Sequence, residues 1–182
     1  MSVLLEDEVE ETGELVLPRL LLVPPRLKTK LSSGETVTGN RYDVVLACQP
    51  DALDHYELYD NIEELVENRK RLRIYCPHRD LATNKELSEV VDFTVREAIP
   101  RTKIVLVHLT TITPEIQKMF DATHLNNKPF ILFYAEETRP FNKTTARNIR
   151  NHFCYRGEYA YFNEEHVVGL LDEAIDDALR VG

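Results

Sequence analysis

KIVLVHLTTITPEIQKMFDATHLNNKPFILFYA, residues 103–135, decides the fold class. An apolar run opens this stretch at residues 103–109 and another closes it at residues 128–135, and each run is typical of a strand that is covered on both faces. Between them, Thr113 and Pro114 form a cap residue followed by a proline at the first helical position, which predicts a helix to about residue 125. The stretch therefore predicts a strand-helix-strand unit of a parallel sheet.

The same alternation extends from this unit in both directions. Toward the amino terminus, residues 43–48 and 71–76 are short apolar runs, and a helical stripe of apolar side chains spans about residues 54–69 between them. Residues 158–162 form a fifth run, and Asn163 is placed to cap a final helix. Five strands joined by helices predict a three-layer α/β sandwich with a five-stranded parallel sheet in the order 2-1-3-4-5, of flavodoxin-like or Rossmann-like type.

The chain before this pattern has a different composition. Of its net charge of −9, six acidic residues lie within residues 6–14, and residues 15–40 contain three prolines and two glycines. We interpret residues 1–40 as an acidic tail and a proline-containing arm, and residues 41–182 as the α/β domain. The apolar residues 15–23 are expected to be covered, either by their own subunit or by a second copy, because exposed they would form a sizeable apolar patch.

Composition and charge exclude several classes of function. There is no long basic run, which argues against a surface that binds nucleic acid through its phosphates. Residues 15–23 are interrupted by Pro18 and Arg19 and are too short to cross a bilayer, and the acidic start lacks the positive region of a signal peptide. We therefore expect a soluble cytoplasmic protein without a membrane partner. Its three cysteines lack the spacing of a zinc site, so we expect no metal and three reduced, mostly buried thiols: Cys48, Cys76 and Cys154.

Polar side chains follow several of the predicted strands, and ligands of such sheets bind outside the carboxyl ends of the strands. The first loop has no glycine and the chain has no phosphate-binding loop, which excludes dinucleotide-binding and P-loop sites. The expected ligand contacts are Cys48, Gln49, His78, Asp80, Thr110 and Thr113. A structural interpretation stays open in the second loop, where His78 is a hydrogen-bonded imidazole at the surface and Asp80 pairs with Arg79 or caps a turn.

Two carboxylates complete the candidate site. Glu115 follows the third strand and falls in the first turn of the predicted helix, where an acid also complements the helix dipole without any catalytic purpose. Asp92 lies in a helix that we expect to begin at the capping-box pair Thr83 and Glu86. Its alternative role is an ion pair with Arg96, four residues further along that helix.

The order of these motifs resembles the nucleoside 2-deoxyribosyltransferase family, together with its deoxynucleoside-monophosphate N-glycosidase relatives, over about residues 42–179. The resemblance lies in one aspartate, Asp92, and in six segments: VVLACQP (44–50), LYDNIEEL (58–65), RIYCPHRD (73–80), KIVLVHLTTITP (103–114), NKPFILF (127–133) and EYAYFNEEHVVGLLDEA (158–174). It implies a homo-oligomer that cleaves the N-glycosidic bond of a deoxynucleoside or deoxynucleotide without a cofactor.

The resemblance also implies roles for the two carboxylates. A glutamate after the third strand would attack the anomeric carbon, as in a retaining glycosidase, and Asp92 would contact the base. A match without gaps places Met119 at the position of that glutamate, whereas a shift of four residues brings Glu115 there. The alternatives are a catalytically silent nucleotide-binding protein and a homodimeric interaction protein of the same fold.

Overall fold

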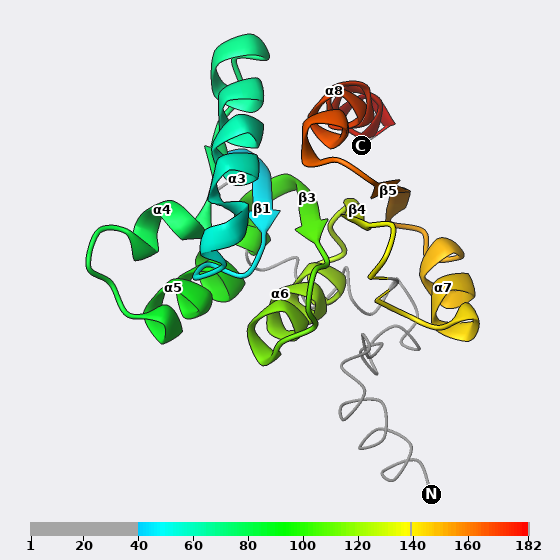
Figure 1. The fold of residues 1–182 in the computed structure, drawn as a ribbon, viewed down its shortest axis with the longest axis horizontal. Helices are drawn as coiled ribbons and strands as arrows, with labels where there is room; N and C mark the ends of the chain where they lie inside the picture. The colour runs from blue at the N-terminus through cyan, green and yellow to red at the C-terminus, as the bar shows by residue number, and fades with distance from the viewer. Residues whose placement is uncertain (1–39, 139, 182) are drawn as a thin grey trace, which may run out of the picture.

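The computed structural model describes residues 40–138 and 140–181. Its five-stranded, all-parallel sheet has the strand order β2-β1-β3-β4-β5, which confirms the predicted α/β fold and its topology (Figure 1). The strands are β1 (Tyr42–Ala47), β2 (Ile74–Tyr75), β3 (Thr102–His108), β4 (Phe130–Ala135) and β5 (Tyr155–Tyr161).

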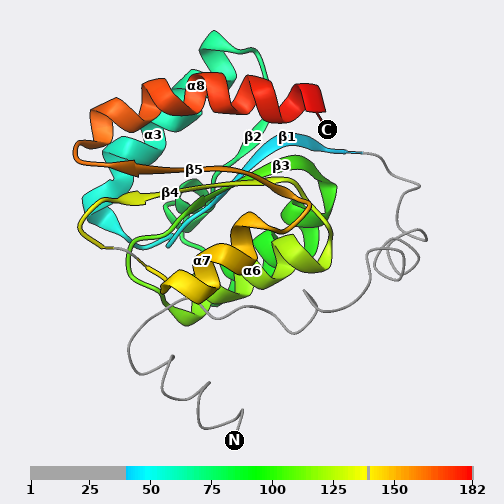
Figure 2. The same ribbon diagram turned by 90° about the vertical axis from the view of Figure 1, so that its right-hand side faces the viewer.

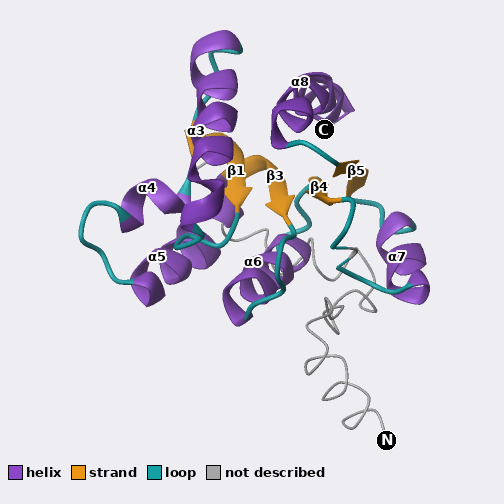
Figure 3. Cartoon of the chain, viewed as in Figure 1, coloured by secondary structure: helices purple, strands orange, loops and turns teal. Residues whose placement is uncertain are grey.

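Helices cover both faces of the sheet (Figure 2). On one face lie α3 (Tyr56–Glu64) and α8 (Glu164–Val181), and on the other lie α5 (Leu87–Phe93), α6 (Pro114–Leu125) and α7 (Lys143–Arg150). The short α4 (Pro77–Leu81) follows β2. Figure 3 shows the strands as a single layer between these helices. Shorter helical segments complete the fold: η3 (Leu53–His55), η4 (Leu65–Arg69), η5 (Thr94–Ala98) and η6 (Ile99–Arg101).

The two helical layers enclose separate apolar clusters, because successive strand residues point to opposite faces of the sheet. Val45, Val105 and Leu132 pack toward α5 and α6, whereas Leu46 and Leu106 pack toward α3 and α8. All five side chains are fully buried. β1 and β3 pair in parallel over most of their length, as expected of the two most continuously apolar runs.

Two local predictions were wrong. The second strand is only Ile74–Tyr75, and Arg71 has a positive φ of 58°, which lies outside the range of an extended strand. The capping box is also absent: the Thr83 hydroxyl donates to the Asp80 carbonyl, and α5 begins after Glu86, whose side chain makes no capping hydrogen bond. In contrast, Thr113 and Asn163 accept hydrogen bonds from backbone amides at the starts of α6 and α8, as predicted.

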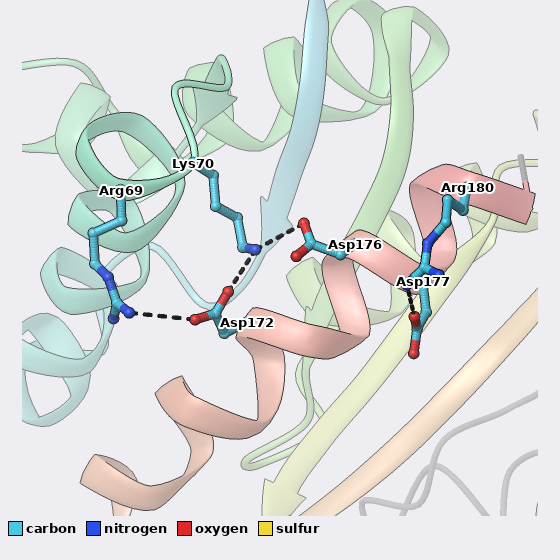
Figure 4. A network of polar contacts seen from close by, with 6 residues as sticks. All are labelled: Arg69, Lys70, Asp172, Asp176, Asp177 and Arg180. Carbon is cyan, nitrogen blue, oxygen red and sulfur yellow. Dashed lines mark hydrogen bonds and ion pairs between the residues drawn. The ribbon is translucent and has the colours of Figure 1, made fainter.

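An ion-pair network fastens α8 to the end of the α3/η4 helical run (Figure 4). The Lys70 ammonium lies 2.5 Å from Asp172 and 2.8 Å from Asp176, and only 8% of its side chain is exposed. Arg69 reaches the other Asp172 oxygen at 3.4 Å. Burial opposes the charge of Lys70, but the two aspartates outweigh it and raise the lysine's pKa. The network fixes α8 at its middle, away from the carboxyl edge of the sheet.

The tail and arm predicted for residues 1–40 lie outside the described residues except for Asn40, and so does the predicted cover over residues 15–23. Within residues 40–138 and 140–181, no helix combines the length and apolarity that crossing a membrane requires. The three cysteines are free and buried, as the sequence predicted.

Candidate functional site

The two residues that follow β1 point their side chains to opposite faces at the carboxyl edge of the sheet. Cys48 is fully buried among the side chains that face α3 and α8, whereas Gln49 turns toward the start of α6. This divergence follows from the alternation of strand side chains. It separates the candidate residues into two polar groups, one on each side of the β1/β3 pair.

The first group, which we call the open group, consists of Gln49, Thr113 and Glu115. The Thr113 hydroxyl donates to Gln49 Oε1, and Gln49 Nε2 donates to Glu115 Oε1 at 3.1 Å and to Asp51 at 2.7 Å. Thr113 also caps α6 by accepting from the Ile116 amide at 3.2 Å. A loop residue and a helix cap thus hold one oxygen of the Glu115 carboxylate in place.

A pocket of about 400 Å³ lies beside the open group, between α5 and α6, and is called the α5/α6 pocket below. Glu115 and Asp92 both contribute to its wall, together with Val91 and Leu87. Its volume falls within the range of small-molecule sites. The two carboxylates selected from the sequence therefore face one cavity, although they come from different helices.

The rim of the α5/α6 pocket also carries positive charge. Arg96 and Lys118 line it, and Arg96 Nε lies 3.1 Å from Asp92 Oδ1, which is the expected pair at a spacing of four residues. Both partners of that pair are more than half exposed, so the pair is weak and its arginine is available to an anion. Thr110 is half-buried in the loop between β3 and α6.

The second group, which we call the closed group, lies on the α3/α8 face and consists of Tyr59, His108 and Tyr161. His108 is fully buried at the end of β3; its Nδ1 lies 2.8 Å from the Tyr59 hydroxyl and its Nε2 lies 2.7 Å from the Tyr161 hydroxyl. A neutral imidazole has one donor and one acceptor nitrogen, so one tyrosine donates to it and the other accepts. Every polar atom of the ring is therefore paired within the protein.

Burial and a neighbouring histidine keep His108 neutral. Burial lowers the pKa of His108 well below its usual value, and the adjacent His55 lowers it further. The His55 ring meets His108 edge-on at 5.0 Å, and its Nδ1 lies 2.6 Å from Glu164 at the start of α8. The closed group therefore ties β3, α3 and β5 together at the carboxyl edge, and the pair of His55 with Glu164 adds α8.

None of the six expected ligand contacts lines the α5/α6 pocket, and three of them lie in a different part of the fold. Cys48 belongs to the same buried face as the closed group, and burial raises the pKa of its thiol far above the usual range. His78 is buried and bonds Asp60 through Nε2 at 2.9 Å. Asp80 accepts from the Tyr75 hydroxyl at 2.7 Å instead of pairing with Arg79, which binds Glu63. Of the sequence candidates, the structure brings together Gln49, Thr113, Glu115 and Asp92.

His108 and Tyr161 are not among the residues that the sequence pattern indicated. One signal was available: His108 is the only ionisable side chain within the apolar run IVLVHL, where a buried polar group requires a partner. The identity of the partners was not available, because they lie 49 and 53 residues away along the chain.

The described residues contain no group of three or more histidine, cysteine or acidic side chains arranged to hold a metal ion. No protein-family model matches this chain, and no curated protein matches it.

Proposed function

We propose that the protein binds a deoxynucleoside or its monophosphate in the α5/α6 pocket and cleaves the N-glycosidic bond, with Glu115 as the nucleophile. The observation that carries the proposal is the open group, in which Gln49 holds the Glu115 carboxylate at a pocket that Asp92 also lines. Paired carboxylates at one cavity are what a retaining glycosidic mechanism uses. Arg96 and Lys118 on the rim suit the phosphate of a nucleotide substrate.

In this mechanism a Glu115 oxygen bonds to the anomeric carbon while the bond from that carbon to the base nitrogen breaks. The electron pair of the broken bond stays on the base, and Asp92, which takes up a proton from solvent before this step, passes that proton to the base as it leaves. A water molecule or a second base then attacks the anomeric carbon and restores the Glu115 carboxylate. Asp92 takes back one proton in this step, either from the attacking water or from the ring nitrogen of the attacking base. Gln49 acts as a positioning residue, since it fixes Glu115 before the substrate arrives.

Met119 supports a second candidate, a nucleotide-binding protein without catalysis. Met119 occupies the position that a match without gaps gives to the family glutamate, and it is fully buried in the apolar cluster beneath α6. Glu115 lies one helical turn closer to the start of α6, at the pocket. The two candidates therefore differ in whether a glutamate at this turn reaches the anomeric carbon.

Release of free base separates the two candidates. The four common deoxynucleosides and their 5′-monophosphates are incubated with the protein and with Glu115→Gln, and free base is measured by chromatography. We expect base release that falls at least 100-fold in Glu115→Gln, because the amide cannot act as the nucleophile. The matched control is Glu89→Gln, an acid in the first turn of α5 that lies outside the pocket wall.

Two other results would overturn the catalytic proposal. Base release that survives Glu115→Gln removes Glu115 from the mechanism. Nucleotide binding without any base release from the wild type establishes the silent binding protein instead.

A further inference from the structure

A second cavity lies at the opposite edge of the sheet, where the strands begin, and is called the amino-edge cavity. Its volume is about 580 Å³, and its wall includes Lys103 of β3, Lys128 before β4 and Arg156 of β5. Phe153 and Leu179 add apolar surface to the same wall. This cavity and the α5/α6 pocket share no wall residue.

The charged side chains in the wall of the amino-edge cavity are all positive. None of the described residues in its wall is acidic, although the chain as a whole has a net charge of −9. Lys103 is compensated by Asp43, whose carboxylate lies 3.0 Å from its ammonium just outside the wall. Among the described residues, Lys128 and Arg156 have no such acidic partner.

The two uncompensated cations are not satisfied by the protein. Burial lowers the pKa of Lys128, so its charged form would gain from an anion. Arg156 donates from Nη1 to the carbonyls of Phe153 and Tyr155, but its buried Nε has no partner among the described residues. Buried donors without partners are rare and carry a free-energy penalty. The carboxyl ends of α6 and α8 also face this edge, and their partial negative charge opposes an anion, so Lys128 and Arg156 have to outweigh it.

We propose that the amino-edge cavity binds a small organic phosphate of nucleoside monophosphate size, with the phosphate at Lys128 and Arg156. Charge-assisted hydrogen bonds from a lysine and an arginine are the usual means of holding a phosphate. The Phe153 ring is 51% exposed at the wall and offers a face for an aromatic base. This site is independent of the proposed glycosidic chemistry, because none of its residues lines the α5/α6 pocket.

Calorimetric titration of the full chain with adenosine 5′-monophosphate tests the site, with adenosine and inorganic phosphate as partial probes. We expect the monophosphate to bind more tightly than either probe. Lys128→Gln and Arg156→Gln are each expected to weaken its binding at least tenfold, whereas Lys128→Arg keeps the charge and retains binding. Lys143→Gln is the matched control, since it removes an exposed lysine at the start of α7 that lines neither pocket.

The outcomes separate this proposal from the glycosidic one. Undiminished binding in both Lys128→Gln and Arg156→Gln overturns the site, as does an absence of binding at millimolar concentrations. Binding that is lost in Lys118→Gln but kept in Lys128→Gln places the nucleotide in the α5/α6 pocket and likewise overturns it. Glu115→Gln is expected to leave this binding unchanged whether or not the protein cleaves a glycosidic bond.

Discussion

The open and closed groups lie at the same carboxyl edge of the sheet, but the polar atoms of the closed group are buried and paired, whereas Glu115 of the open group faces a cavity. In the closed group, both ring nitrogens of His108 bond to buried tyrosines, and the His108 side chain has no exposed surface. In the open group, Glu115 is half-buried, is held through one oxygen and faces a cavity of about 400 Å³. The difference lies in access, because the burial that lowers the pKa of His108 also keeps a ligand from its ring, whereas Glu115 faces a cavity.

The difference in burial between the two groups follows from the alternation of strand side chains. After β1 ends at Ala47, Cys48 points toward one face and Gln49 toward the other. His108, the last residue of β3, lies on the face of Cys48, where its ring stacks on Phe133. His108 and the two tyrosines on the side of α3 and α8 are buried, and they form hydrogen bonds with one another. Those that point toward α6 meet the loop before that helix, where a ligand can enter. The closed group therefore stabilises the edge on which the open group is built.

Removing His108 is the strongest test of this comparison. His108→Leu leaves the buried hydroxyls of Tyr59 and Tyr161 without their partner, which we expect to lower the free energy of unfolding by about 2–4 kcal/mol. Tyr161→Phe removes only one of the two hydrogen bonds and should cost about 1 kcal/mol. Urea unfolding measures both. A variant His108→Leu as stable as the wild type would show that the closed group does not hold the edge together.

The next effect concerns a buried carboxylate that, unlike Glu115, is fully paired. Burial alone raises the pKa of Asp43, but hydrogen bonds from the Arg73 amide and side chain and from Lys103 outweigh it and lower the pKa to about 2. Because the folded-state pKa lies below the unfolded value of 3.8, this stabilisation is present above about pH 4. It is lost as the pH falls toward 2, and it amounts to about 2 kcal/mol.

Comparison with Asp43→Asn isolates this effect from the other acids. The difference in unfolding free energy between the two proteins, measured in urea from pH 2 to pH 7, should shrink steadily below pH 4. A difference that is constant with pH would mean that Asp43 has an ordinary pKa in the folded protein.

The sequence predicted the sheet well because apolar runs and helical stripes report burial directly. The runs that became β1, β3 and β4 are each buried on both faces, so their pattern had one interpretation. The run before Cys76 failed because only Ile74 and Tyr75 pair with β1. Thr83 failed as a helix cap because its hydroxyl bonds back to Asp80 in the preceding turn, a local competition that residue spacing does not reveal.

The candidate site was predictable only in part. The topology rule located Gln49, Thr113 and Glu115 correctly at the carboxyl edge, since each follows a central strand. It could not distinguish Gln49 from Cys48, because which face a residue takes depends on the register of a single position. Nor could it exclude His78, which α4 buries against α3 after β2 ends earlier than expected.

The smallest expected effect on stability concerns the exposed ion pair of Arg96 and Asp92 at the α5/α6 pocket. Arg96→Ala removes the ion pair with Asp92, and because both side chains are more than half exposed we expect a loss of only about 0.3–0.5 kcal/mol. Arg101→Ala is the matched control: it breaks an equally spaced pair with Glu97, at 2.8 Å, that lies outside the pocket. The two variants should be equally stable in urea, and the loss of stability should become smaller at high salt.

Only Arg96→Ala should weaken the binding of deoxynucleoside monophosphates. Equal effects of both variants on nucleotide binding would mean that Arg96 does not contact the nucleotide and belongs to the helix surface alone.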